Sequence, residues 1–161
     1  MANRDLQPEV TASLLDRLFD LYPESQHDES RTTDEQVREF RSALCRDLSA
    51  LLNTRRAEED FDHSYEESVN SLLTFGIIDF TAYNLKNDMD QEHLRRSMER
   101  SIRRFEPRLD RVTVSIEEAD SQRPALRLQI SAVLRTEAAE PVVFDATVQR
   151  DSRRVAVSGR V

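Results

Sequence analysis

The stretch SIRRFEPRLDRVTVSI, residues 101–116, marks the point at which the apolar pattern of the chain changes. Before Pro107 the apolar residues recur every three or four positions, as on one face of a helix; after it they alternate with polar residues, as in a strand. A proline fixes its own φ and disfavours helical backbone in the residue before it. We therefore expect a helix to end at Glu106, with Glu106 and Arg108 displayed close together on a stiff corner.

Four alternating apolar series follow this corner and predict four strands of an antiparallel meander with one solvated face. They lie at residues 112–116, 126–134, 142–148 and 155–157. The last series is short and is flanked by arginines. We expect it to be an edge strand, which makes Val155 and Val157 candidates for pairing with a strand from another chain.

Upstream of the corner, the chain begins with a predicted short helix at residues 11–22. Leu14, Leu15 and Leu18 lie on its broad apolar face. The polar stretch that follows has no periodicity, so we divide the chain into a tethered helix with its linker (1–34) and an α+β domain (35–161). A short helix is unstable alone in water, so its apolar face must dock, either on its own domain or on a partner.

Two core helices are predicted within the second part. A capping box at residues 33–36 opens one that runs to about Asn53. The other starts at Asp88 or Asp90 and reaches Phe105. Helices first and strands last define an α+β fold, with the helices packed on one face of a C-terminal antiparallel sheet of about four strands.

The segment between these helices gives weaker signals. An acidic stretch covers residues 58–67, and a capping box at residues 64–67 predicts a short helix through residues 72–73. Gly76 is a natural stop for this helix. We expect residues 77–87 to form a connecting loop.

The composition is that of a small, acidic domain. The 161 residues are 38% hydrophobic and 34% charged, with a net charge of −8 and one cysteine. An acidic chain argues against nucleic acid as the main partner, because phosphate contacts dominate such binding. No apolar run is long enough for a membrane helix and residues 1–5 do not begin a signal peptide, so we expect a cytoplasmic protein without direct membrane insertion.

No sequence motif for catalysis, metal binding or a cofactor is recognisable. His27, His63 and His93 are scattered, without the spacings typical of zinc ligands. Two glycines cannot build a glycine-rich phosphate loop. The carboxylates of residues 58–62 fall in a polar stretch, which is more typical of a solvated loop or a protein contact than of a glycosidase site. We expect no enzymatic activity, no metal and no cofactor.

A stripe of arginines lies on the predicted helix that ends at Phe105. At about 100° per residue, Arg96, Arg100, Arg103 and Arg104 gather on the side opposite to the apolar face. Such a stripe is either a solvated face or a surface that docks an acidic partner.

Three motifs occur in one order along the chain: SLLDRL at 13–18, LLNTRR at 51–56 and FEPRL at 105–109. Together they resemble the TssE family of baseplate subunits from bacterial type VI secretion systems. That family is similar to the small wedge protein of contractile phage tails, once labelled lysozyme-like. The resemblance covers about residues 12–150. It departs from the family at FGIIDF, residues 75–80, where a Tyr-Gly-Leu-Pro-Asp-like turn is usual.

The resemblance implies a structural subunit of a baseplate docked at the inner membrane, which joins the wedge to the contractile sheath. It implies that Glu106, Pro107 and Arg108 contact other wedge subunits, and that the partners are TssF, TssG and TssK in the wedge and TssB and TssC in the sheath. Combined with the expected edge strand, it leads to the hypothesis that this subunit seeds sheath assembly by strand addition. The old family label keeps an alternative open, a peptidoglycan-active lysozyme-like hydrolase.

Overall fold

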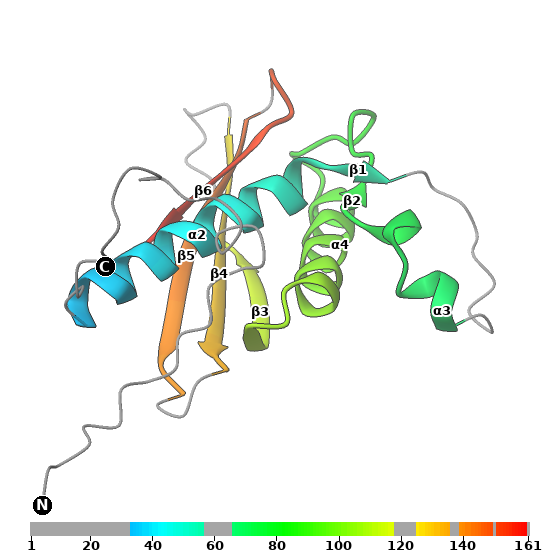
Figure 1. Cartoon of the computed structure of the whole chain (residues 1–161). Coiled ribbons are helices and arrows are strands. Elements are labelled where there is room, and N and C mark those ends of the chain that lie inside the picture. The colour runs from blue at the N-terminus through cyan, green and yellow to red at the C-terminus, as the bar shows by residue number, and fades with distance from the viewer. Residues whose placement is uncertain (1–32, 57–65, 118–124, 136–138, 150, 161) are drawn as a thin grey trace, which may run out of the picture.

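The computed structural model describes residues 33–56, 66–117, 125–135, 139–149 and 151–160. Helices occupy the first half of this region and a four-stranded antiparallel sheet the second, which confirms the predicted α+β class (Figure 1). The predicted helix at 11–22, with Leu14, Leu15 and Leu18, lies outside the described residues.

All described helices come before the corner at Glu106, and the four strands of the larger sheet come after it (Figure 1). The helical elements are α2 (Thr33–Asn53), α3 (Glu66–Val69), the 3-10 turn η1 (Leu72–Thr74) and α4 (Asp88–Phe105). The strands are β1 (Arg55–Arg56), β2 (Ile77–Ile78), β3 (Leu109–Ile116), β4 (Ala125–Leu134), β5 (Pro141–Gln149) and β6 (Val155–Gly159).

The larger sheet has the order β3-β4-β5-β6, with every neighbouring pair antiparallel. Its strands bury alternate side chains, so one face joins the core and the other is more exposed. The register between β3 and β4 shifts between Asp110 and Thr113, where Arg111 has a φ of 49°. The four-stranded meander predicted from the alternation is confirmed.

Helices α2 and α4 cover the buried face of the sheet, with α2 against β6 and α4 against β3 (Figure 1). In α2, apolar residues at spacings of three and four form one buried stripe. It consists of Phe40, Leu44, Leu48, Leu51 and Leu52. None of the described helices has the length and apolar character needed to cross a membrane.

Residues 66–78 differ from the sequence prediction. Helix α3 ends at Val69 instead of continuing to Leu73, because Ser71 takes extended backbone and its hydroxyl caps a new 3-10 turn by accepting from the Leu73 N–H at 3.3 Å. The expected loop after Gly76 begins with β2, which pairs in parallel with β1. A two-residue strand is too short to leave a periodic signal.

Gly76 allows this small parallel pair to form. Its φ is +103°, and a Cβ at this position would collide with the carbonyl oxygen of Thr54. The pair is fixed to α4 through Ser101, whose hydroxyl donates to the Gly76 carbonyl at 2.8 Å. At the start of α4 the cap is Asn87, one residue before the predicted Asp88, and its side chain accepts from the Met89 N–H at 2.9 Å.

Candidate interaction surfaces

The corner between α4 and β3 is built from backbone as well as side-chain contacts. Glu106 caps α4, and its N–H donates to the Ile102 carbonyl at 2.9 Å. The Leu109 N–H donates to the Glu106 carbonyl at 3.2 Å, which closes a turn around Pro107. The chain therefore reverses within three residues and enters the sheet.

The side chains of this corner pair with one another. Arg108 reaches both carboxylate oxygens of Glu106, with Nε and an Nη atom each at 2.6 Å, and the same Nη lies 2.7 Å from Asp47 in α2. The fork geometry is the strongest form of an arginine–carboxylate pair. Its hydrogen bonds with Glu106 raise the pKa of Arg108 above its usual range, against the opposing effect of burial.

The expectation that the corner displays both charges is therefore corrected. Glu106 is only 4% exposed and Arg108 is partly buried, while Pro107 is exposed. The turn around Pro107 brings the two side chains together, and a buried carboxylate is stable only when it is paired. The binding of wedge subunits by this corner stays a prediction.

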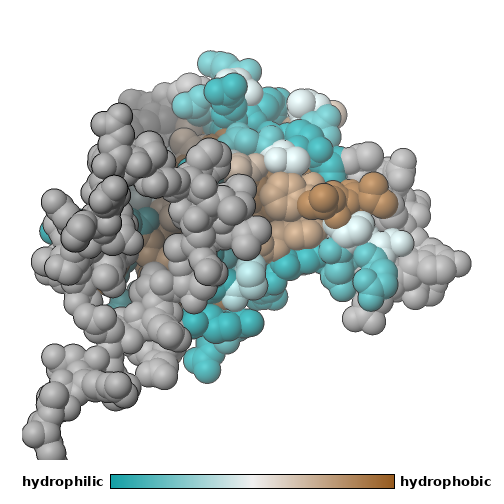
Figure 2. Space-filling view, in the orientation of Figure 1, coloured by the Kyte–Doolittle hydropathy of each residue, from teal (hydrophilic) through white to brown (hydrophobic). Residues whose placement is uncertain are grey.

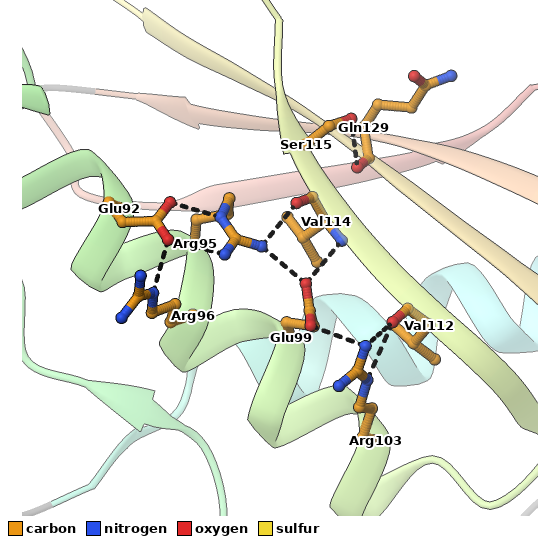
Figure 3. A network of polar contacts seen from close by, with 9 residues as sticks. All are labelled: Glu92, Arg95, Arg96, Glu99, Arg103, Val112, Val114, Ser115 and Gln129. Atoms are coloured by element: carbon orange, nitrogen blue, oxygen red, sulfur yellow. Dashed lines mark hydrogen bonds and ion pairs between the residues drawn. The ribbon is translucent and has the colours of Figure 1, made fainter.

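Helix α4 also makes a charged network with the outer backbone of β3 (Figure 3). Arg95 donates to the Val114 carbonyl at 3.0 Å, and Glu99 accepts from the Val114 N–H at 3.2 Å. Arg103 donates to the Val112 carbonyl through Nε at 2.9 Å and through an Nη atom at 2.6 Å. These side chains occupy the backbone groups that another strand would need, so the β3 edge of the sheet is closed.

Within the same network, Glu92 joins two arginines of α4. It accepts from Arg95 at 2.6 and 2.8 Å and from Arg96 at 2.6 Å. These hydrogen bonds lower the pKa of Glu92 to about 2. Sequence reasoning missed Arg95 and Glu99, although glutamates placed three or four residues before arginines on one helix are a recognisable signal.

The opposite edge of the sheet, β6, is only partly covered. Asn53 at the end of α2 bonds both backbone groups of Val155, accepting from its N–H at 3.0 Å and donating to its carbonyl at 2.8 Å. In an antiparallel ladder the backbone groups of alternate residues point the same way, so those of Val157 also point outward. Within the described part of the chain they have no partner. The next outward N–H, that of Gly159, bonds the Cys45 thiol of α2. The expected open edge is therefore limited to the backbone groups of Val157, whose side chain is half-buried against the core.

A shallow hollow lies beside the end of β6. It has a volume of about 260 Å³, and its lining includes Arg41 of α2, residues 141–144 of β5, and Gly159 and Arg160. The Nε of Arg41 is buried there with no hydrogen-bond partner in the described structure. Because β5 extends past the end of β6, its first residues have no strand neighbour on this side.

The predicted arginine stripe divides into two kinds of residue. Arg96 pairs with Glu92, and Arg103 pairs with Glu99 at 2.8 Å while it also bonds β3. Arg100 and Arg104 make no ion pair or hydrogen bond with any described residue. Arg96 and Arg103 therefore stabilise the fold, whereas Arg100 and Arg104 form a cationic surface without a counter-charge in the described structure.

Three observations on the described residues concern metal binding and catalysis. Among residues 33–56, 66–117 and the later described segments, no group of three or more His, Cys, Asp or Glu side chains could hold a metal ion. The lining of the hollow beside β6 contains no carboxylate, whereas a glycosidase cleft needs two. Burial raises the pKa of the Cys45 thiol, which is typical of an inert cysteine.

These features together are those of a small α+β protein that uses its charges to brace its fold and that leaves one sheet edge partly open. The family model of the baseplate wedge protein gp25 matches residues 38–139. The chain therefore belongs to the baseplate wedge protein family, whose members have a structural role in baseplates. Comparisons with curated proteins and with solved structures found no match.

Proposed function

We propose that this protein is a TssE-type, non-enzymatic subunit of a type VI secretion baseplate, which works in the cytoplasm in a baseplate docked at the inner membrane. It links the wedge to the contractile sheath and seeds sheath assembly. Its wedge partners are TssF, TssG and TssK, and its sheath partners are TssB and TssC. The family supports the baseplate role, and the motif order in the sequence supports the particular system.

The difference between the two sheet edges carries the seeding part of the proposal. Side chains of α4 occupy the outer backbone of β3, whereas Val157 on β6 keeps an outward N–H and carbonyl with no partner in the described structure. An extended arm of a sheath protein can add to such an edge through main-chain hydrogen bonds. The hollow beside Gly159 and Arg160 offers room for a side chain of the incoming strand.

In this proposal the wedge subunits contact the exposed Pro107 of the corner, and the charges of Glu106 and Arg108 hold the corner in shape. The Glu106–Arg108 fork, held to α2 through Asp47, fixes the exposed Pro107 on a rigid turn. A preorganised turn binds with a smaller entropy cost than a mobile one. The wedge subunits therefore contact the outside of a corner that the buried pair holds in shape.

Replacing Val157 by proline tests the seeding role. Proline lacks the N–H that an incoming strand needs, but the N–H of Val157 is not used in the ladder with β5, and edge positions of this kind tolerate proline. We expect Val157→Pro to fold, to co-purify with TssF and TssG, and to abolish sheaths in the source bacterium carrying a fluorescent sheath subunit. The matched control is Val157→Ala, which keeps the N–H and should assemble sheaths.

Normal numbers and lengths of sheaths in the folded Val157→Pro strain would contradict seeding at this edge. Loss of sheaths in both the proline and alanine strains would also contradict it, because the effect would then follow the valine side chain. Val155 is unsuitable for this test, since its N–H already bonds Asn53.

A further inference from the structure

A separate surface lies on α4, and its lining includes no residue of β6 and neither Glu106 nor Arg108. A hollow of about 590 Å³ opens between the end of α3 and this helix. Five of its six lining residues are polar cations or amides: the lining is Asn70, Arg96, Glu99, Arg100, Arg103 and Arg104. On a chain with a net charge of −8, this is a local region of opposite sign.

Two of these arginines have no counter-charge in the described structure. Arg100 is exposed and Arg104 half-buried, and neither pairs with a described acidic residue. They are four residues apart, about one turn of the helix, so their guanidinium groups lie on one side. Two neighbouring cations repel one another unless an anionic group joins them.

Two exposed apolar side chains follow Asn70, which lines this hollow together with the arginines. Leu72 is 85% and Leu73 63% exposed. Leu72 follows Asn70 of the hollow by two residues, so their Cα atoms are at most about 7 Å apart. Figure 2 shows a brown, hydrophobic area beside teal atoms on the side of the molecule that carries α3 and α4.

A hydrogen-bonded turn holds these leucines outward. Ser71 caps η1, and the buried Thr74 donates to the Val69 carbonyl at 2.6 Å. Phe75 then packs edge-on against Phe105, with ring centroids 5.2 Å apart, next to Arg104 in the sequence. The leucines and the free arginines are therefore fixed relative to one another.

We infer that Leu72, Leu73, Arg100 and Arg104 form a docking surface, here called the α4 surface, for an acidic amphipathic segment of a second protein chain. The leucines contact the apolar side of that segment and the two guanidinium groups pair with its carboxylates. Arginine combined with exposed apolar side chains is typical of interface centres, and the charge complementarity selects an acidic partner. Arg96 and Arg103, already paired, contribute less.

The test measures binding of three fluorescein-labelled peptides of about 18 residues to the full chain by fluorescence anisotropy. The first has leucines at helical spacing and glutamates elsewhere, the second is its scrambled form, and the third has lysine in place of glutamate. We expect the first to bind tightest, and its affinity to fall as sodium chloride rises from 50 to 500 mM, because exposed charges are screened.

Charge reversal and leucine replacement then locate the site. Arg100→Glu with Arg104→Glu should weaken binding of the acidic amphipathic peptide at least tenfold, and Leu72→Ser with Leu73→Ser should weaken it several-fold. The matched control, Arg38→Glu with Arg127→Glu, makes the same charge change at exposed residues of α2 and β4 and should leave binding within twofold.

Three outcomes would overturn the inference. Equal loss in the control pair, or equal binding of the scrambled peptide, would indicate charge attraction without a site. Binding that appears only after the carboxylates of residues 58–62 are neutralised would assign the α4 surface to the chain's own acidic segment. Self-association that Arg100→Glu with Arg104→Glu abolishes would assign it to a second copy of this chain.

Discussion

Glu106 and Arg108 are separated by one proline, and this spacing determines how their charges are used. The turn lets Arg108 take both carboxylate oxygens of Glu106 and also reach Asp47, which is 61 positions away in the sequence. Burying one charge without its partner is costly, and here both carboxylate oxygens of Glu106 are paired, while the second Nη atom of Arg108 is buried without a hydrogen-bond partner in the described structure. The FEPRL motif is therefore a brace for the junction between helix and sheet as well as a candidate contact.

Breaking this pair should destabilise the free protein. We expect Glu106→Gln to lower the free energy of unfolding by about 3–5 kcal/mol, because it leaves Arg108 partly buried without its main counter-charge. Urea denaturation measures this. The control is Glu140→Gln, an exposed carboxylate, which should change stability by less than about 0.5 kcal/mol. Equal stability of Glu106→Gln and the wild type would mean that the corner's charges serve only partners.

Glu92 gives the fold a defined sensitivity to acid. Hydrogen bonds from Arg95 and Arg96 lower its pKa from 4.5 to about 2 in the folded state. A group with a depressed folded pKa stabilises the fold above its unfolded pKa, and this contribution is lost as the pH falls from about 4.5 to about 2. Glu92→Gln should flatten the fall in the urea midpoint over this pH range. If the urea midpoint of Glu92→Gln falls with pH as steeply as that of the wild type, other carboxylates cause the acid sensitivity.

At the scale of elements, the side chains of α4 cover the β3 edge of the sheet. Its arginines and Glu99 use the carbonyls and the N–H that β3 would otherwise present to solvent (Figure 3). Exposed strand edges promote unwanted pairing between chains, and charged side chains are a common protection. The two edges therefore differ in degree: on β3 the side chains of α4 take both backbone groups of Val114, whereas on β6 the helix α2 takes those of Val155 and the Gly159 N–H and leaves those of Val157 without a partner in the described structure.

Opening the β3 edge should make the protein self-associate. Glu99→Ala frees the Val114 N–H and leaves Arg95 and Arg103 without a shared carboxylate, so we expect concentration-dependent dimers or larger species in sedimentation velocity. Glu92→Gln is the matched control, because it weakens the same network without releasing a backbone group of β3. A monomeric Glu99→Ala protein, or equal association of both variants, would contradict the closing role of this network.

The elements that the sequence predicted well are those with local signals. Helix α4 and strands β3 to β5 each repeat an apolar pattern over many residues, β6 repeats it over three, and this pattern is set by neighbours in the chain. The pair β1–β2, the burial of Glu106 and the bond from Asn53 to Val155 were not predictable in this way. They join residues far apart, 102 positions in the case of Asn53 and Val155, and depend on how the packed elements meet.

The same distinction between local sequence signals and contacts of distant residues applies to the candidate sites. The sequence located the corner, the arginine stripe and the edge strand, because each is a local composition or a local break in period. It could not separate Arg100 and Arg104 from the paired Arg96 and Arg103, since that depends on where α4 lies against β3. The partial cover of β6 likewise depends on where α2 ends.

At the scale of the whole molecule, the protein presents several surfaces with different chemistry. The corner exposes Pro107 while the pair that braces it is buried or half-buried, the α4 surface combines leucines with free arginines, and Val157 on β6 offers backbone hydrogen bonds. A small subunit that joins different partners needs such separate surfaces. The proposed roles assign the corner to the wedge and β6 to the sheath.

The central claim is that an extended arm of a sheath protein pairs with β6 and not with β3. Hydrogen–deuterium exchange of the purified protein, with and without purified TssB–TssC sheath protein, tests it most directly. Amides that gain a hydrogen-bond partner exchange more slowly. We predict slower exchange of the Val157 amide on adding sheath protein, with no change at Val114, whose amide already bonds Glu99. Protection at β3, or no protection at β6 when the sheath protein is bound, would contradict the account.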